Sequence, residues 1–192
     1  DAFSDDNTYE IGSGLGANMF LLQGERTKAK NFALSKSVGE FLLFIDSDMI
    51  LEPRVIEECI RLSLLDSKIG GIIIPEKSIG PGFWVRVRDF ERSLYAGSKI
   101  ESARFFVKKY VELAGGFDEG VIAYEESTLP QKIENIGMNV DARISSFILH
   151  IEDGFMLRKW LRKKRYYSMS SKLYSMKYEY YAKSQLSVFN RF

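Results

Sequence analysis

Two aspartates separated by one residue follow the most strand-like stretch of the sequence. Asp46 and Asp48 come directly after the apolar run 41–45, and such a run is typical of a strand buried on both faces. Ligands of open α/β sheets bind beyond the carboxyl ends of the strands, which is where these carboxylates would lie. Paired carboxylates favour a hard cation such as Mg²⁺ or Mn²⁺, which in turn binds phosphate groups. A solvated acidic turn is the alternative for a tripeptide this common.

His150 is the only histidine of the chain and closes a second strand-like stretch, 140–149. A neutral imidazole is a good ligand for Mn²⁺ or Zn²⁺ and a poor one for Ca²⁺. At the end of a late strand, it would approach the same edge of the sheet as Asp46 and Asp48. A lone histidine is more often structural, so both interpretations stand.

Two further acids, Glu125 and Glu126, precede a predicted helix at 127–135 and follow a glycine-rich turn at 115–119. Carboxylates at the start of a helix are stabilised by the helix dipole, which is sufficient to explain them. The functional alternative is a general base that takes a proton from a hydroxyl group.

The elements that would position these residues alternate between strand and helix. Strands are predicted at 17–22, 41–45, 70–74, 103–107 and 140–149, and helices at 8–15, 27–38, 53–65, 109–114 and 127–135. Thr27 is the expected cap of the second helix, and the stretch 75–102 is expected to be mainly loop. This order predicts an α/β fold with a mixed, mostly parallel sheet flanked by helices.

The composition is that of an ordinary globular protein, with 192 residues, 45% apolar and 28% charged;. No apolar run approaches the roughly 18 residues needed to cross a bilayer, and no signal segment precedes the first elements. Cys59 is the only cysteine, so neither an internal disulfide nor a cysteine zinc cluster can form. These features fit a protein of the reducing cytoplasm.

The end of the chain is strongly basic. Between Met156 and Lys183 there are nine Lys or Arg residues and one acid, Glu179, which give a local charge of +8 and leave −7 for the rest. We expect a body at 1–152 and a basic, aromatic helical extension at 153–192. The extension is either a docked helix with solvated charges or an interfacial segment that meets anionic lipid at the membrane periphery. No nucleic-acid-binding motif accompanies the charge, so a nucleic-acid partner is not expected.

The apolar residues of this extension bear on the choice. Helical spacing puts Leu157, Trp160 and Leu161 on one face, which would be the face that docks on the body;. Lys163 and Tyr167 belong to the same basic, aromatic segment.

Several blocks of the sequence resemble the family 2 glycosyltransferases, which have the GT-A fold. The central block of that family is similar to the stretches Arg26-Thr27-Lys28-Ala29-Lys30-Asn31, Gly39-Glu40 and Leu43-Phe44-Ile45-Asp46-Ser47-Asp48. The residues DAFSDDNT at 1–8 resemble an aspartate-rich loop after the family's second strand. Gly115-Gly116-Phe117-Asp118-Glu119, followed by Glu125-Glu126 and Leu129, resembles its acceptor-side block, and His150 falls where many members keep a metal-binding histidine.

The resemblance implies an inverting transfer of a sugar from a nucleotide-diphosphate donor to an acceptor hydroxyl. It assigns Asp46, Asp48 and His150 to a divalent cation, Mn²⁺ or Mg²⁺. The acceptor remains open between protein, lipid-linked and polysaccharide substrates.

The same resemblance implies roles for the remaining candidates. Glu126 aligns with the family's catalytic base, and Glu125 is the second choice. The nucleoside and diphosphate of the donor would contact four residues: Asp1, Arg26, Lys30 and Asp46.

The sequence also departs from the family pattern. The family's first strand and helix have no counterpart before Asp1, Ala2 replaces the second acid of the usual pair, and Glu125-Glu126 stands where Glu-Asp is usual. Either the chain is a trimmed member or its numbering begins inside a longer natural chain. A nucleotidyltransferase and a sugar-nucleotide-binding protein without turnover are the alternatives to a transferase.

Overall fold

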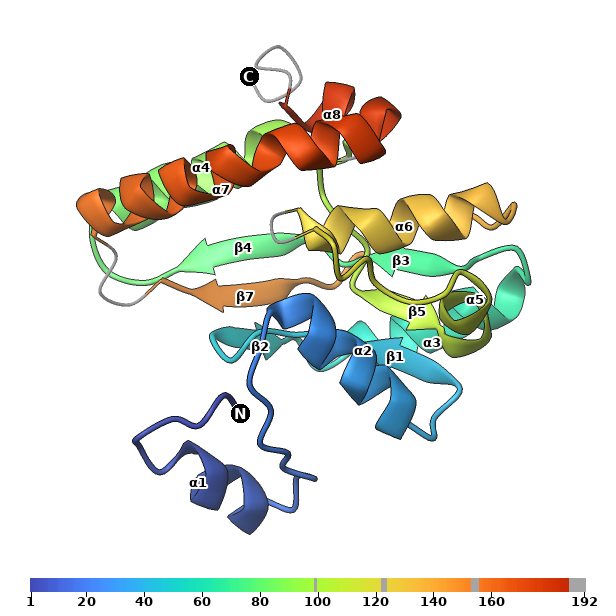
Figure 1. Cartoon of the computed structure of the whole chain (residues 1–192), viewed down its shortest axis with the longest axis horizontal. Helices are drawn as coiled ribbons and strands as arrows, with labels where there is room; N and C mark the ends of the chain where they lie inside the picture. Colours follow the sequence, from blue (N-terminus) through green and yellow to red (C-terminus); the bar gives the residue numbers. More distant parts are fainter. Residues whose placement is uncertain (99, 122–123, 153–155, 187–192) are drawn as a thin grey trace.

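The computed structural model describes residues 1–98, 100–121, 124–152 and 156–186. The helices are α1 (Thr8–Gly14), α2 (Arg26–Lys36), α3 (Val55–Leu65), α4 (Phe83–Tyr95), α5 (Lys108–Leu113), α6 (Glu125–Asn135), α7 (Leu157–Lys177) and α8 (Glu179–Leu186). The strands are β1 (Phe41–Leu43), β2 (Met49–Leu51), β3 (Gly71–Ile73), β4 (Glu76–Ile79), β5 (Phe105–Val107), β6 (Ala142–Arg143) and β7 (Ile148–Ile151). Figure 1 shows the strands between α1 on one side and the layer of α4, α7 and α8 on the other.

The strands form two mixed sheets, ordered β1-β5-β3-β6 and β2-β7-β4. The pairs β1–β5, β3–β5 and β2–β7 are antiparallel, whereas β3–β6 and β4–β7 are parallel. The mixed α/β architecture is therefore confirmed, but the prediction that the sheet is mostly parallel is wrong for the described strands. Continuous apolar runs are typical of the strands of parallel sheets, because both faces of those strands are buried. Here the antiparallel strand β5, which lies between β1 and β3, is buried on both faces as well.

Both faces of the larger sheet are covered by apolar side chains. Successive residues of a strand point to opposite faces, and accordingly Phe106 packs with Leu129 and Ile133 of α6, whereas Phe105 packs with Val55 and Cys59 of α3. This double burial explains the uninterrupted apolar runs of β1, β3 and β5.

The boundaries of several elements differ from the prediction. Residues 17–22 form no strand, and the stretch expected to be mainly loop contains β4 and α4. The residues Gly80-Pro81-Gly82, which break regular secondary structure, favoured a loop, but they form only the short turn between these two elements. α2 begins at Arg26, so Thr27 lies inside its first turn instead of capping it, and its buried hydroxyl has no hydrogen-bond partner among the described residues.

The C-terminal helices pack on the body through aromatic side chains. Tyr174, Tyr178 and Tyr181 form a third core with Val121, and the Tyr178 hydroxyl donates a hydrogen bond of 2.6 Å to Asp118. The part of the predicted extension at 153–155 and 187–192, and the side chains of residues 163 and 167, lie outside the described residues. No helix in the described part of the chain is both long and apolar enough to cross a membrane.

The packing face predicted for the extension is only partly correct. Trp160 faces the body and lines a cleft, but Leu161 is 53% exposed. The strongest anchor of the extension is the tyrosine core further along α7 and α8.

Candidate active site

A cleft of about 710 Å³ lies between the ends of the strands and the layer of α4 and α7. Six predicted site residues line it: Arg26, Asp46, Asp48, Glu125, Glu126 and His150. Several charged residues that the sequence analysis had not singled out also line the cleft, among them Glu76, Arg92 and Arg104. The acidic turn at 46–48 and the glutamate pair at 125–126, which are far apart in the sequence, therefore face one cavity.

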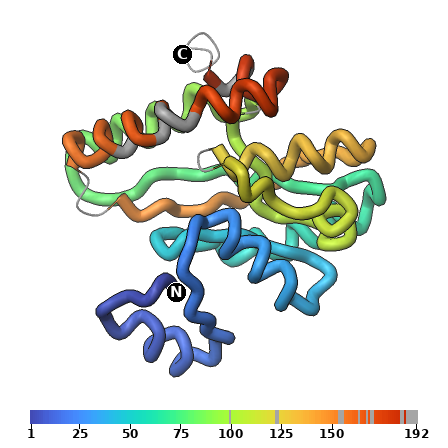
Figure 2. The backbone as a smooth tube through the Cα atoms, in the orientation of Figure 1, coloured from blue at the N-terminus to red at the C-terminus, as the bar shows by residue number. Residues whose placement is uncertain are grey.

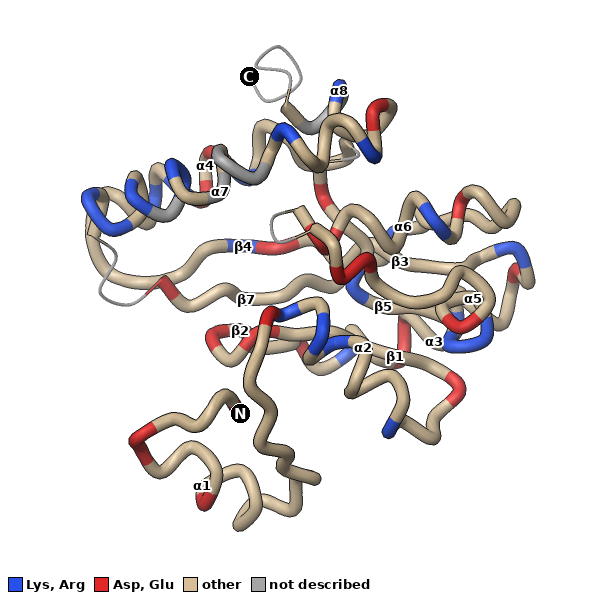
Figure 3. The backbone as a smooth tube through the Cα atoms, viewed as in Figure 1, with Lys and Arg blue, Asp and Glu red and all other residues tan. Residues whose placement is uncertain are grey.

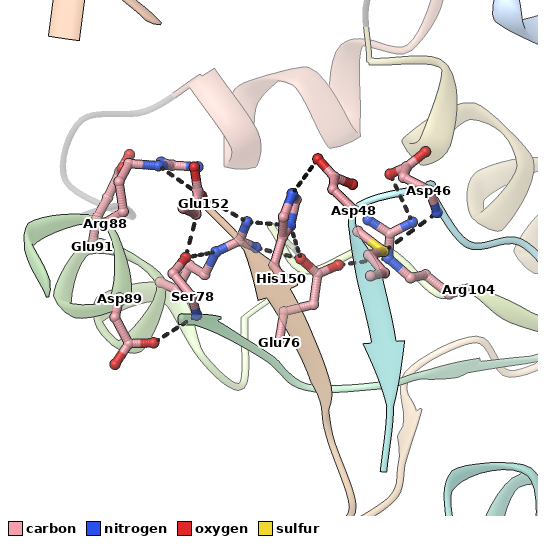
Figure 4. A network of polar contacts seen from close by, with 12 residues as sticks. Asp46, Asp48, Glu76, Ser78, Arg88, Asp89, Glu91, Arg104, His150 and Glu152 are labelled. Carbon is pink, nitrogen blue, oxygen red and sulfur yellow. Dashed lines mark hydrogen bonds and ion pairs between the residues drawn. The ribbon is translucent and has the colours of Figure 1, made fainter. Parts of the chain in front are cut away.

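The acidic turn lies between β1 and β2, and strand pairing brings it to His150. Met49 of β2 is opposite His150 of β7, and the backbone N–H of Ile151 donates to the Asp48 carbonyl at 2.8 Å. Asp48 Oδ2 consequently lies 3.2 Å from His150 Nε2 (Figure 4). His150 is part of β7 and does not follow it, which is why the partner strand holds the imidazole at the turn.

Asp46 is turned toward a different partner. Its Oδ2 atom lies 3.6 Å from Nη1 of Arg104, on the far side of Asp48 from His150 (Figure 4). Within the described residues, no three Asp, Glu, His or Cys side chains are close enough together to hold a metal ion. The donor chemistry of two carboxylates and an imidazole fits Mn²⁺ or Mg²⁺, with two of the three donors in contact and the third paired to an arginine.

Glu76 of β4 lies behind this turn in a network of half-buried charges. Its carboxylate accepts hydrogen bonds from Arg92 and from Nε of Arg104, the latter at 2.5 Å, and lies 3.4 Å from Nδ1 of His150. Burial alone would raise the pKa of Glu76, but the imidazole and the two guanidinium groups outweigh it and lower that pKa below the ordinary value;. The carboxylate is therefore ionised and holds the arginines and the imidazole in place.

His150 has two competing partners at the same nitrogen. Arg92 Nη2 is 2.8 Å from Nδ1, and Glu76 Oε2 is 3.4 Å from it. A guanidinium can only donate, so its contact requires a bare Nδ1, whereas the Glu76 contact requires Nδ1–H. The hydrogen bond with Glu76 raises the pKa of His150, and burial and the charge of Arg92 oppose that rise. A proton on Nδ1 leaves Nε2 free for a metal ion.

The acidic pair begins helix α6 on the other side of the cleft. Glu125 is buried, with 7% of its side chain exposed, and its Oε1 lies 3.6 Å from Arg26 and 3.8 Å from Lys30. Burial and the neighbouring charge of Glu126 raise the pKa of Glu125. Tyr124 precedes the pair with a φ of 65°, an unusual backbone conformation for a residue other than glycine, and its ring stacks on Tyr174 of α7 at 5.0 Å.

Glu126 is more accessible than Glu125. Its side chain is 35% exposed, and Oε1 lies 3.5 Å from Lys30 and 4.0 Å from Arg104. Burial acts to raise the pKa of Glu126, but the charges of Arg104 and Lys30 prevail and lower it. The more exposed of the two carboxylates is thus the one whose ionised form is favoured, and a general base must be ionised before it takes a proton;.

The structure does not bring all predicted residues to the cleft. Lys30, expected to contact the donor, is not among the residues that line the cleft, but its side chain is only 16% exposed and contacts both glutamates. Asp1 does not line the cleft; its carboxylate accepts hydrogen bonds from Ser4. Figure 2 shows the N-terminal segment lying beyond α2, on the opposite side of the molecule from α4 and α7.

Arg104 is the residue whose importance the sequence analysis missed. It pairs with Asp46, Glu76 and Glu126, and so connects the two sides of the cleft. Burial would lower the pKa of Arg104, but these carboxylates raise it and keep the charge. The sequence does contain a signal of this role, because Arg104 is a charged residue within the otherwise apolar stretch 103–107. An arginine that is buried with such a stretch requires charged partners.

Comparisons with known proteins point to one class of fold. The sequence matches no family model. A hyaluronan synthase from Pasteurella multocida is 22% identical over 178 residues, which cover 85% of this chain and 18% of that protein. The curated relative is thus matched over less than a fifth of its length.

Two solved glycosyltransferase structures resemble the chain. The mannosyltransferase PcManGT from Pyrobaculum calidifontis, in complex with GDP-Man and Mn²⁺, has a TM-score of 0.67 at 16% identity over 92% of this chain and 53% of its own. A fragment of S. aureus TarS in complex with UDP-GlcNAc has a TM-score of 0.60 at 18% identity over 81% and 49%. The chain spans about half the length of these structures, and its fold is the mixed α/β fold of GT-A glycosyltransferases.

Proposed function

We propose that this chain is the catalytic part of a glycosyltransferase that moves a sugar from a nucleotide-diphosphate donor to an acceptor hydroxyl, with inversion and with a divalent cation. The observation that carries the proposal is the two-sided cleft: Asp48 and His150 lie on one side, Glu126 on the other, and Arg104 contacts both sides. Both structural relatives are complexes with nucleotide sugars, which supports the same donor class. Residues 1–152 form the catalytic body in this proposal, and 153–192 an extension of it.

Each side of the cleft has a distinct role. Glu126 accepts the proton of the acceptor hydroxyl while the acceptor oxygen bonds to the anomeric carbon, and the bond from that carbon to the diphosphate oxygen breaks with its electron pair. Inversion needs only this one carboxylate, whereas a glycosidase requires a second, protonated one beside the bond. Arg26 and Lys30 provide positive charge next to the acidic pair, where the anionic donor would enter.

The opposite side would hold the cation. Asp46, Asp48 and His150 would bind Mn²⁺ or Mg²⁺, which when present neutralises charge on the diphosphate. Arg104 pairs with Asp46 and Glu126 in the structure. If Arg104 paired with phosphate oxygens of the sugar donor in their place, Asp46 would be free to bind the cation.

The test is a panel of nucleotide sugars incubated with the protein and Mn²⁺, with the released nucleotide identified. Release of nucleoside diphosphate that is faster with an added acceptor, and absent in Glu126→Gln, supports the transferase. Release of pyrophosphate from a nucleoside triphosphate and a sugar phosphate would instead identify a nucleotidyltransferase. Saturable nucleotide-sugar binding without any turnover would leave a binding protein.

A further inference from the structure

Helix α4 presents an apolar stripe to solvent. Phe83, Val87, Phe90 and Leu94 are exposed large hydrophobic residues, and their spacing of four, three and four positions puts them on one face of the helix. Phe83 and Phe90 are 62% and 64% exposed, whereas Val85, which points the opposite way, is buried. A row of exposed phenylalanines on one helix face is unusual for a surface that meets only water.

Helix α7 runs beside α4 and adds positive charge to the same layer. The Arg88 guanidinium lies 5.6 Å from the Trp160 ring, and Glu91 lies 3.9 Å from Lys164, so the first half of α7 lies beside the middle of α4 (Figure 1). The sequence of α7 contains no Asp or Glu. Figure 3 shows the basic residues gathered toward its first half; the exposed ones there are Arg158, Lys159, Arg162 and Arg165.

The exposed residues of α7 are mixed in character. Leu161, Tyr166, Leu173 and Met176 are exposed on the same helix as these cations. A protein interface is depleted of charge at its core, whereas an interfacial membrane segment combines Lys and Arg with Trp, Phe and Leu. Trp84, also exposed, lies at the first turn of α4, as aromatic side chains do at the headgroup level of a bilayer.

We propose that the outer face of α4 and the first half of α7 binds the surface of an anionic lipid bilayer. The stripe of α4 enters the headgroup–acyl boundary, and the basic residues of α7 contact lipid phosphate groups. The inner faces of the same helices line the cleft through Arg88, Glu91, Trp160 and Lys164, so a single layer of helices would separate the cleft from the bilayer. The proposal concerns this surface alone and does not depend on the reaction assigned to the cleft.

The experiment is cosedimentation of the whole chain with vesicles of phosphatidylcholine alone and of phosphatidylcholine with phosphatidylglycerol. We expect binding only to the anionic vesicles and weaker binding at high salt, because salt screens exposed charges. Phe90→Glu and the pair Arg158→Glu/Arg162→Glu should each weaken binding by at least about tenfold. The matched control is Leu64→Glu on α3, whose side chain is similarly exposed, at 74%, and which should bind as the wild type does.

A second measurement reports contact of α4 itself with the lipid. Trp84 and Trp160 are the only tryptophans, and brominated acyl chains should quench wild-type fluorescence much more than that of Trp84→Phe. Absence of wild-type binding to anionic vesicles, or equal binding by Phe90→Glu and Leu64→Glu, overturns the proposal. Self-association in analytical ultracentrifugation that Phe90→Glu abolishes, without vesicle binding, would assign the stripe to a second copy of the chain instead.

Discussion

The two ends of the cleft are built in different ways. At the end formed by β4 and β7, Glu76 contacts Arg92, Arg104 and His150, and each of these has a further partner. At the end formed by α6, the contacts of Glu126 with other described residues are longer, 3.5 Å to Lys30 and 4.0 Å to Arg104, and a third of its side chain is exposed. One end is a tightly connected network, and the other presents a lightly held carboxylate.

This difference matches what the two ends are proposed to do. A cation site gains from ligands whose orientation is fixed before binding, because no reorganisation is then needed. A general base must come within hydrogen-bond distance of an incoming hydroxyl, and contacts of this kind often tighten only when the substrate is present. Arg104 couples the two ends, since it pairs with carboxylates of both.

Substitution at the lightly held end should have the largest effect on turnover. Glu126→Gln keeps the shape of the side chain but removes the proton acceptor, so transfer should fall by about 10²–10⁴-fold. The affinity for nucleoside diphosphate, measured by calorimetry, should change little, because the proposed cation site lies at the other end. Glu125→Gln is the matched control and should retain far more activity.

The reverse result would exchange the two roles. If Glu125→Gln loses transfer while Glu126→Gln keeps it, the buried glutamate is the base, and its raised pKa would require activity to rise with pH through its titration. If neither substitution reduces transfer, the base lies elsewhere in the cleft.

Removing a ligand at the connected end should act on binding. Asp48→Ala, or EDTA added to the wild type, should weaken binding of nucleoside diphosphate by roughly 10²-fold, equivalent to about 2.7 kcal/mol. Asp66→Ala, in a turn whose aspartate accepts a hydrogen bond from the Lys68 backbone, is the control for loss of an aspartate outside the cleft. Equal affinity with and without Mn²⁺ would show that the acidic turn holds no cation.

The same contrast explains how much of the site was predictable. Asp46 and Asp48 follow a strand-like apolar run, so a local pattern was enough to single them out, whereas Glu126 and His150 were selected only through the resemblance to a family. The partners of His150, Glu76 and Arg92, lie in β4 and α4. These elements were predicted to be mainly loop because of the glycines and proline at 80–82. The antiparallel insertion of β5, which brings Arg104 to the cleft, depends on tertiary pairing that no short pattern encodes.

A smaller effect is expected from the residue that orients the imidazole. Glu76→Gln should weaken Mn²⁺-dependent nucleotide binding by about 10–100-fold, as loss of a partner behind a metal ligand typically does. The melting temperature should also fall, because Arg92 and Arg104 lose the carboxylate that pairs with them in a half-buried site;.

Glu91→Gln is the matched control for Glu76→Gln. Glu91 is a similarly half-buried glutamate of the same cleft, but its ion-pair partners are Arg88 and Lys164. The variant should lose some stability and little metal-dependent affinity. If Glu76→Gln affects only the melting temperature, Glu76 stabilises the fold without orienting His150.

The smallest expected effect is a shift in the titration of His150, and it tests the connected end without any ligand. Because His150 is the only histidine, its imidazole signals in NMR spectra need no assignment. In EDTA its pKa should lie above the ordinary value of about 6.5, since Glu76 stabilises the protonated ring. Glu76→Gln should lower this pKa, while Glu91→Gln leaves it unchanged.

A raised pKa means that the charged imidazole favours the folded state. The extra stability is therefore complete below about pH 6.5 and is lost as the pH rises through the folded-state pKa. The melting temperature of the wild type relative to His150→Gln should accordingly be highest on the acidic side of neutrality.

A pKa of His150 below 6.5 would mean that burial and Arg92, which contacts Nδ1 at 2.8 Å, outweigh Glu76. In that case Nδ1 accepts from Arg92, Nε2 carries the proton toward Asp48, and the connected end is organised to hold its own charges in place of a cation.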